Sequence, residues 1–177
     1  MKKFISGLKL YVLNNVISYI PFSGLRNKLI SLSIKSSEER RNFLIGVEYK
    51  APRSITVGEG TVVNKGVLLD GRGGLIIGAN VDIARGVTLW TMSHDYSEEH
   101  AAFSQNVVIG DNCWIGANSQ ILPGITIGQN VIIGCGSIVT KSFPDNVVIA
   151  GNPAKIIKER CVKSIKEYEL NYKPWFI

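Results

Sequence analysis

The sequence predicts an all-β fold, a three-sided parallel β-helix of six-residue units, with a short N-terminal helical segment and a C-terminal helix. Three observations predict the β-helix: a period of six, an aliphatic third residue in every unit, and a Gly or small polar residue after most of these. One unit makes a short strand and a corner, three units close a coil, and coils stack about 4.8 Å apart. A β-sandwich would alternate with period two and turn every ~8–12 residues.

The repeat begins at Ile55 and ends at Ser142, with two interruptions. The twelve third residues are Val57, Val63, Leu69, Ile77, Ile83, Leu89, Ile109, Ile115, Ile121, Ile127, Ile133 and Val139. We expect all twelve to point inward. The Gly or Asn beside each should take the turn conformation that a Cβ opposes. Twelve units give four coils.

The repeat divides the chain into three parts. Residues 1–50 form a helical flank, residues 51–152 the β-helix with a loop at 90–106, and residues 153–177 a helix and tail. Apolar residues recur at helical spacing up to Pro21, which stops the first helix. This segment either caps the open first coil or rests on a membrane surface. Asn152-Pro153 resembles a helix start.

Composition limits the function classes. The 177 residues hold 20 Lys+Arg and 14 Asp+Glu, with positive charge in the flanks and an acidic middle. Basic residues are not interleaved with aromatics along one surface, so nucleic-acid binding is not expected. Basic ends suit a membrane surface, an anionic lipid-linked substrate or a phosphorylated cofactor. Three cysteines without metal or redox spacing favour a reduced, cytoplasmic chain.

The phase of the repeat breaks between Leu89 and Ile109. The inserted stretch WTMSHDYSEEHAAFSQN should leave the coils as an external loop, where function commonly gathers. It holds both histidines, His94 and His100, beside the carboxylates Asp95, Glu98 and Glu99.

The stretch from Val107 to Arg160 resembles the hexapeptide-repeat acyltransferases, and the likeness extends over roughly residues 55–160. That resemblance implies a left-handed β-helix, a homotrimer with active sites between subunits, and acetyl-coenzyme A as acetyl donor. Within the family the chain looks most like the maltose/galactoside and colanic-acid type of sugar O-acetyltransferase. The implied reaction acetylates a hydroxyl of a sugar or polysaccharide precursor. The alternative is N-acetylation of a nucleotide-linked amino sugar, because hydroxyl and amine acceptors need similar bases.

The resemblance places the catalytic base at His94, within Ser93-His94-Asp95. Imidazole is the side chain whose pKa suits proton removal near neutral pH. We expect His94 to deprotonate the acceptor hydroxyl directly, with no acyl-enzyme. Asp95, Glu98 or a backbone carbonyl would orient the ring.

Coenzyme A needs a groove of small residues and cations for its phosphates. The resemblance places the groove at outward positions of adjacent coils, with the Ala117 N–H near the thioester carbonyl. The nucleotide end is expected at Thr140, Lys141, Lys155 and Lys158. The groove residues are Trp114, Gly116, Ala117, Gly134, Cys135 and Gly136.

Acceptor residues are expected two coils below the loop, where the resemblance places the sugar. Asn64 and Asp70 occupy corners there, although both also suit plain turns. Tyr96 and Trp90 offer rings for stacking on a sugar. No metal is expected, since a three-histidine zinc site exceeds the two histidines of the chain.

Overall fold

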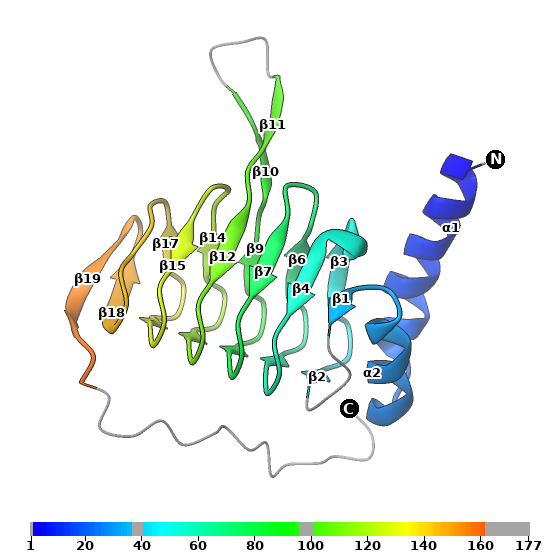
Figure 1. Ribbon diagram of the computed structural model, residues 1–177, viewed down its shortest axis with the longest axis horizontal. Helices are drawn as coiled ribbons and strands as arrows, with labels where there is room; N and C mark the ends of the chain where they lie inside the picture. Colours follow the sequence, from blue (N-terminus) through cyan, green and yellow to red (C-terminus); the bar gives the residue numbers. More distant parts are fainter. Residues whose placement is uncertain (1, 37–40, 96–100, 162–177) are drawn as a thin grey trace.

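The computed structural model describes residues 2–36, 41–95 and 101–161. The chain winds into a left-handed parallel β-helix whose three faces are parallel sheets (Figure 1). The first face holds β1 (Lys35–Ser36), β4 (Ile55–Val57), β7 (Leu75–Ile77), β12 (Val107–Ile109) and β15 (Thr126–Ile127). The second holds β2 (Asn42–Phe43), β5 (Val62–Val63), β8 (Asp82–Ile83), β13 (Trp114–Ile115), β16 (Ile132–Ile133) and β18 (Val147–Gly151), with β19 (Ala154–Glu159) at its edge. The third holds β3 (Glu48–Lys50), β6 (Leu68–Asp70), β9 (Thr88–Leu89), β14 (Gln120–Ile121) and β17 (Ile138–Val139).

The core is a column of inward side chains. All twelve predicted aliphatic residues, from Val57 to Val139, are at most 2% exposed, which confirms the period of six. Each is in register with a counterpart one coil away, as Ile115 is with Ile83 and Ile133. Full burial of one such side chain contributes about 1.5–3 kcal/mol, so the column supplies a large part of the driving force for folding.

The corners differ from the expectation in one respect. The left-handed conformation lies three residues after the inward residue, as at Asn118 (φ 58°) after Ile115, and not directly after it. The residue directly after is often Gly for another reason. A Cβ on Gly110 would lie 2.7 Å from the backbone N of Gln129 in the next coil. These glycines therefore allow one corner to stack directly on the next.

The β-helix also begins before residue 51. β1, β2 and β3 form an additional first coil, so there are five complete coils where the repeat predicted four. Phe43 and Tyr49 fill its inward positions, both fully buried, with their rings 6.3 Å apart. The helical part of the flank is therefore confined to α1 (Lys2–Asn15), η1 (Ile17–Tyr19) and α2 (Ser23–Ser31), and η2 (Pro52–Ser54) links the first two coils.

The helices cap this first coil, as one of the two alternatives predicted. The Asn14 side-chain amide donates to Tyr49 O (2.9 Å) and accepts from Tyr49 N (3.0 Å), so it pairs with β3 as a strand would. Asn27 does the same for β2, accepting from Phe43 N and donating to Arg41 O. The buried Arg26 donates its Nε to Phe43 O. These bonds satisfy backbone groups that an open edge would leave free for aggregation.

The opposite end corrects the prediction of a helix from residue 153. Ala154–Glu159 is strand β19, which pairs antiparallel with β18 and covers the edge of the second face (Figure 1). Pairing with an available strand edge outweighs the helical spacing of the apolar residues. The remainder of the predicted helix and tail, residues 162–177, lies outside the described residues. Among the helices that the structure describes, none is long and apolar enough to cross a membrane.

Candidate active site

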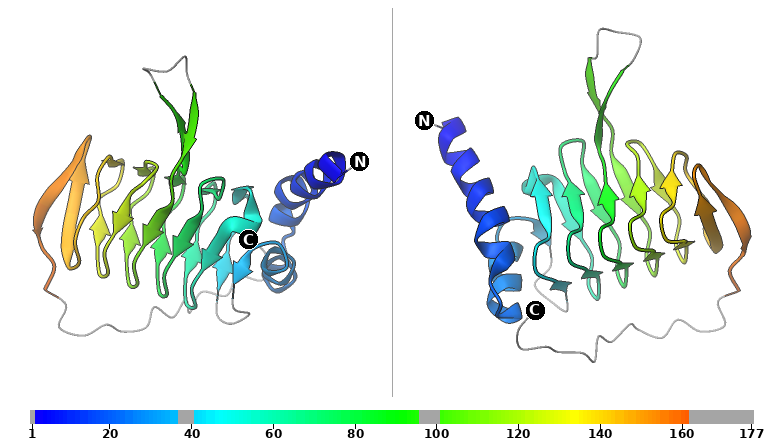
Figure 2. Two further views of the ribbon diagram at one scale, coloured as in Figure 1. Left: turned by 45° about the horizontal axis from the view of Figure 1, so that its top comes forward. Right: turned by 180° about the vertical axis from the view of Figure 1, so that it is seen from behind.

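The predicted loop forms a two-stranded arm that rises from the coils (Figure 2). β10 (Met92–His94) and β11 (Ala102–Ser104) pair antiparallel, with His94 opposite Ala102. Asp95 N donates to Ala101 O at 2.9 Å, which extends the ladder one step beyond His94. His94 is exposed on this arm. Tyr96, Glu98, Glu99 and His100 lie outside the described residues, so the structure does not place the predicted stacking ring or the second histidine.

The arm is anchored where β9 ends. Thr91 is fully buried, and its hydroxyl donates to Asp70 O (2.9 Å) while accepting from Gly73 N (2.8 Å). Its carbonyl accepts from Gln105 N (2.9 Å), which closes the base of the arm. We call this corner, between the third and first faces, the arm edge. Lys50, Asp70, Trp90, Leu122 and Thr140 stand on it, one in each complete coil.

Asp70 supports the arm from beneath. It lies one coil below Trp90, and not two, because β6 pairs directly with β9. Its carboxylate is fully buried and accepts from Arg72 Nε and Arg72 Nη2, both at 2.9 Å, and from Thr91 N at 3.3 Å. Burial alone would raise the pKa of Asp70, but the hydrogen bonds from Arg72 and Thr91 together outweigh it and hold this pKa below its ordinary value.

These contacts make Asp70 a structural anchor, whereas the sequence predicted an acceptor ligand. Arg72, whose role was not predicted from the sequence, keeps 37% of its side chain exposed beside the arm. Arg72 lies in Asp70-Gly71-Arg72-Gly73-Gly74, which breaks the period of six by two residues, and this break is its signal in the sequence.

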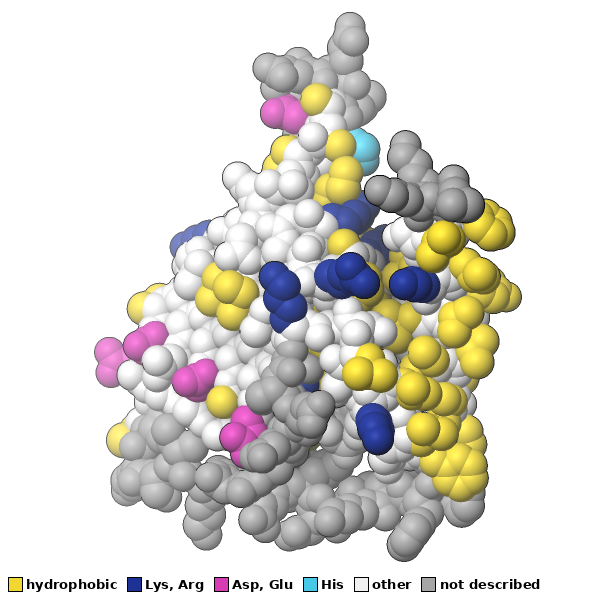
Figure 3. Space-filling model, turned by 45° about the vertical axis from the view of Figure 1, so that its right-hand side comes forward, with side chains coloured by type: hydrophobic (Ala, Val, Ile, Leu, Met, Phe, Trp, Pro, Cys, Tyr) yellow, Lys and Arg dark blue, Asp and Glu magenta, His cyan; other side chains and the backbone are white. Residues whose placement is uncertain are grey.

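Cations gather along the same edge. The Lys50 ammonium lies 4.9 Å from the centre of the Trp90 ring, which joins the first coil to the coil that carries the arm. Figure 3 shows Lys and Arg side chains below the histidine on the face between the arm and the helices. Thr140 and Lys141 stand on this edge in the last complete coil, and the Lys141 ammonium lies 5.7 Å from the centre of the Phe143 ring.

A second edge lies between the second and third faces. It carries small residues where the arm edge carries large and charged ones, and we call it the smooth edge. Ala84, Gly116, Gly134 and Ala150 begin its successive corners. A Cβ on Gly116 would lie 2.6 Å from Cys135 N, so the backbones stack without intervening side chains. Ala117, Cys135 and Gly136 follow in these corners, and Cys135 and Gly136 are exposed. The result is a narrow track of small residues and backbone groups.

The remaining predicted residues flank the smooth edge. Trp114 stands on the second face, 54% exposed. Lys155 is opposite Ala150 in the β18–β19 pair, at the end of the track, while Lys158 is opposite Val148, further from it. Asn64, which was predicted at a corner near the acceptor, also belongs to this edge, whereas Asp70 belongs to the arm edge. Its amide donates to Asp82 Oδ1 (3.2 Å) and Ile83 O (3.0 Å).

Cys113 is excluded as a nucleophile. Burial raises the pKa of its thiol to about 11, and its Sγ donates to Gly128 O at 3.1 Å within the core. Within residues 2–36, 41–95 and 101–161, no group of three His, Cys, Asp or Glu could hold a metal ion.

Comparison with known proteins agrees with the β-helix fold and its six-residue repeat. The family described as bacterial transferase hexapeptide (six repeats) matches residues 106–141. A galactoside acetyltransferase solved in complex with coenzyme A is 32% identical, with a TM-score of 0.78, and the match covers 98% of this chain and 88% of that one. A maltose O-acetyltransferase from Clostridium difficile 630 is 30% identical, with a TM-score of 0.77, covering 89% of this chain and 85% of that one. The chain belongs to the hexapeptide-repeat acyltransferases.

A sequence relative in the same family is the putative colanic acid biosynthesis acetyltransferase WcaF of Escherichia coli K12. It is 38% identical over 115 residues, which is 64% of this chain and 63% of the relative. The galactoside O-acetyltransferase of the same bacterium is 45% identical over 101 residues, or 55% of this chain and 50% of the relative. The chain thus matches less than two thirds of the length of these sequence relatives.

The structure does not bring the predicted site together within one chain of this hexapeptide-repeat protein. His94, Thr140 and Lys141 belong to the arm edge, whereas Ala117, Cys135 and Lys155 belong to the smooth edge. The third face, formed by β3, β6, β9, β14 and β17, separates the two edges.

Proposed function

We propose that the protein is an acetyltransferase that moves an acetyl group from acetyl-coenzyme A to a hydroxyl of a sugar or polysaccharide precursor. The observation that carries the proposal is an exposed histidine on a braced arm of a hexapeptide-repeat β-helix. The similarity to a galactoside acetyltransferase that binds coenzyme A supports the donor, and the named colanic acid relative supports a polysaccharide acceptor.

The proposed chemistry needs one general base and one hydrogen-bond donor for the thioester carbonyl oxygen. His94 accepts the proton of the acceptor hydroxyl while the oxygen attacks the acetyl carbon of the thioester. The C–S bond breaks, and His94 returns the proton to the departing thiolate. The Ala117 N–H is proposed to donate to the carbonyl oxygen as its charge grows. No acyl-enzyme forms in this scheme, and the high pKa and burial of Cys113 remove the buried thiol as an alternative.

We infer that two subunits share each site. His94 lies on the arm edge and the Ala117 N–H lies on the smooth edge. The two can act on one acetyl group only if the arm edge of one copy faces the smooth edge of the next. Three copies in a ring repeat this contact three times, because a head-to-tail interface closes under threefold symmetry. The separation of His94 from Ala117 by a full face supports a homotrimer.

The smooth edge fits the pantetheine arm of coenzyme A. A Cβ built on Gly136 meets nothing within 4 Å, so the track is open there, and Ala117 and Cys135 present only small side chains. Lys155 stands where the track ends, which suits an anionic phosphate. From the arm edge of the adjoining copy, Thr140 and Lys141 would approach the same nucleotide. We propose that Lys158, which lies further from the track, contributes positive charge near the phosphates of coenzyme A.

For the acceptor, we propose Arg72 and Trp90 at the base of the arm, together with Asn64 of the adjoining smooth edge. Tyr96, which lies outside the described residues, stays a predicted acceptor contact. Asp70 contributes by holding Arg72. All three cysteines are free, which fits a reducing compartment such as the cytoplasm.

The test is release of free coenzyme A from acetyl-coenzyme A across a panel of sugars, oligosaccharides and amino-sugar nucleotides. His94→Ala should lower kcat by about 10²–10⁴ with an unchanged melting temperature, because the side chain is exposed. The matched control is Ser93→Ala on the same strand, which should keep the rate. Equal rates for wild type and His94→Ala would overturn the base, and activity with amines alone would overturn the acceptor class.

A further inference from the structure

The helical cap uses only one of its faces to cover the first coil. Its other face is apolar and exposed, and it fills one side of the molecule in Figure 3. Of the fifteen large hydrophobic residues that are exposed among the described residues, ten belong to α1, η1, α2 and their links. They are Phe4, Ile5, Leu8, Tyr11, Val12, Val16, Tyr19, Phe22, Leu25 and Leu32. We call these ten residues the outer cap face. A monomer rarely exposes an apolar patch of this kind without a binding role.

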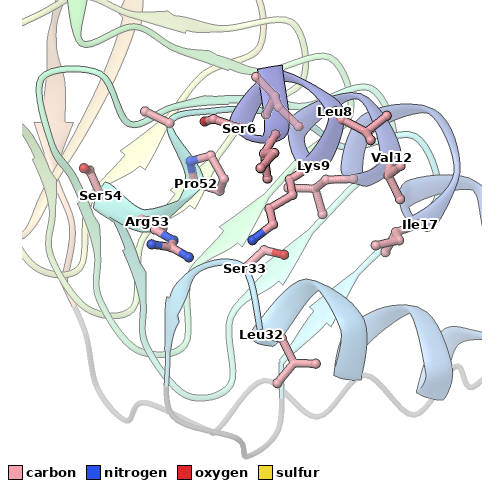
Figure 4. Close-up of a pocket in the computed structure, with 14 residues that line it drawn as sticks. Ser6, Leu8, Lys9, Val12, Ile17, Leu32, Ser33, Pro52, Arg53 and Ser54 are labelled. Atoms are coloured by element: carbon pink, nitrogen blue, oxygen red, sulfur yellow. The ribbon is translucent and has the colours of Figure 1, made fainter. Parts of the chain in front are cut away.

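A groove lies beside this face. It has a volume of about 750 Å³ and runs between α1, the turn after α2 and η2. Its walls are mostly apolar, with Leu8, Val12 and Pro52 among them. Lys9 and Arg53 direct their charged ends into the same hollow from opposite sides, as Figure 4 shows. Apolar walls with two cations at the opening suit an amphiphile with an anionic head.

The charge of the segment points to the same kind of partner. The first 37 residues contain six basic residues and no acidic one. Among the basic residues, Arg26 is buried against the first coil, whereas Lys9, Lys28 and Lys35 are exposed. A helix with exposed Phe and Leu, flanking lysines and no carboxylates is typical of helices that lie in the interface of an anionic membrane.

We propose that the outer cap face docks on an anionic lipid surface, with the α1–η2 groove receiving a lipid headgroup and the start of its acyl chain. α1 has 14 residues, about 21 Å of helix, which suits lying along the interface. Contact between the outer cap faces of two copies is disfavoured, because it would bring only positive charges together.

This docking would place the proposed site near lipid. The groove residues Ala51–Ser54 directly follow Lys50, which stands on the arm edge and reaches Trp90. The inference about position rests on the proposed function, but lipid binding itself does not, so its test measures binding alone.

The test is flotation of the full-length protein with vesicles of phosphatidylcholine, with and without phosphatidylglycerol. Wild type should float with the anionic vesicles, less so at high salt, and not with phosphatidylcholine alone. Leu8→Ser should weaken binding about tenfold, and Lys9→Gln about fivefold. Both side chains are exposed, so the melting temperature should not change.

Two control variants match these in exposure but lie away from the cap. Ile157→Ser on β19 removes a side chain that is 62% exposed, against 53% for Leu8, and Lys65→Gln removes an exposed charge between β5 and β6. Both should float like wild type. Failure of wild type to float with either vesicle, or equal flotation with both, would overturn the proposal. Absence of flotation together with a smaller particle for Leu8→Ser in light scattering would assign the face to a second copy instead.

Discussion

The arm edge and the smooth edge are built on the same inward column and yet differ in almost every other respect. On the arm edge, side chains make the structure: Asp70, Arg72 and Thr91 form a hydrogen-bonded brace, and Lys50 lies over Trp90. On the smooth edge, the Gly116 backbone stacks directly on the backbone of the next coil at Cys135, and Gly134 lies against the methyl group of Ala150. The comparison shows that burial of the first and third residues of each six-residue unit fixes the coil, as with Val81 and Ile83. The corner residues can therefore differ from one edge to the other.

The stacking on the smooth edge gives the largest expected effect on stability. Gly116→Ala introduces a Cβ about 2.6 Å from both Cys135 N and Ile133 O, neither of which can move without shifting the next coil. We expect a loss of about 2–3 kcal/mol in the free energy of unfolding, measured by urea denaturation.

Gly136→Ala is the matched control on the same edge. It meets nothing within 4 Å, and only its φ of +68° opposes a side chain, so it should cost about 1 kcal/mol. Equal losses for the two variants would show that contact with the next coil does not determine the cost of a Cβ on this edge.

The brace on the arm edge gives an intermediate effect, and one that depends on pH. Asp70→Asn removes the charge that Arg72 and Thr91 hydrogen-bond, so we expect a loss of about 2 kcal/mol at pH 7. The folded pKa of Asp70 is lowered, so its contribution is complete above the unfolded pKa of about 3.9 and disappears as the pH falls through the folded value.

The difference between wild type and Asp70→Asn should therefore shrink below about pH 4 in denaturation experiments. If the difference in the free energy of unfolding stayed constant as the pH fell below about 4, the proposed role of the ionised Asp70 carboxylate would be contradicted. Asp111→Asn, whose carboxylate accepts from Ala79 N at a different corner, serves as the comparison for an anionic corner without an arginine partner.

The contact between Lys50 and Trp90 gives the smallest effect. Lys50→Gln should lower the free energy of unfolding by about 0.5 kcal/mol, because the ammonium sits 4.9 Å from the ring at a partly exposed site. Fluorescence of the chain during urea unfolding would report it. Lys65→Gln removes an exposed lysine at another corner and is the comparison. A loss of the same size in this variant would contradict a specific contribution from the Trp90 ring.

The sequence predicted the fold where one physical cause acts alone. The twelve aliphatic third residues, from Val57 to Val139, were predicted to point inward and are buried, because their burial sets the period. The first residue of each unit, such as Val81 or Val131, is buried as well and was not predicted. The first coil was missed because Phe43 and Tyr49 replace the aliphatic signal with aromatic rings. β19 was missed because a strand edge at β18 becomes available only in three dimensions, and helical spacing over a few residues does not reveal it.

The candidate site was also predictable only in part. The break in phase located the arm and His94, since an insertion of irregular length must leave the coil. The role of Asp70 was not predictable, because a corner carboxylate looks the same in sequence whether it meets solvent or Arg72. The separation of His94 from Ala117 follows from counting which face each strand joins, and it becomes evident only when the arm is placed on its edge.

The central claim is that each site combines the arm edge of one copy with the smooth edge of the next. Mixing two inactive variants tests it most directly: His94→Ala, and Ala117→Trp, which fills the track. After the subunits are exchanged at equal amounts, about a quarter of the interfaces would pair an intact His94 with an intact Ala117, so about a quarter of the wild-type rate should return. No recovery, with exchange of subunits demonstrated by mass spectrometry of the mixed assemblies, would contradict a shared site.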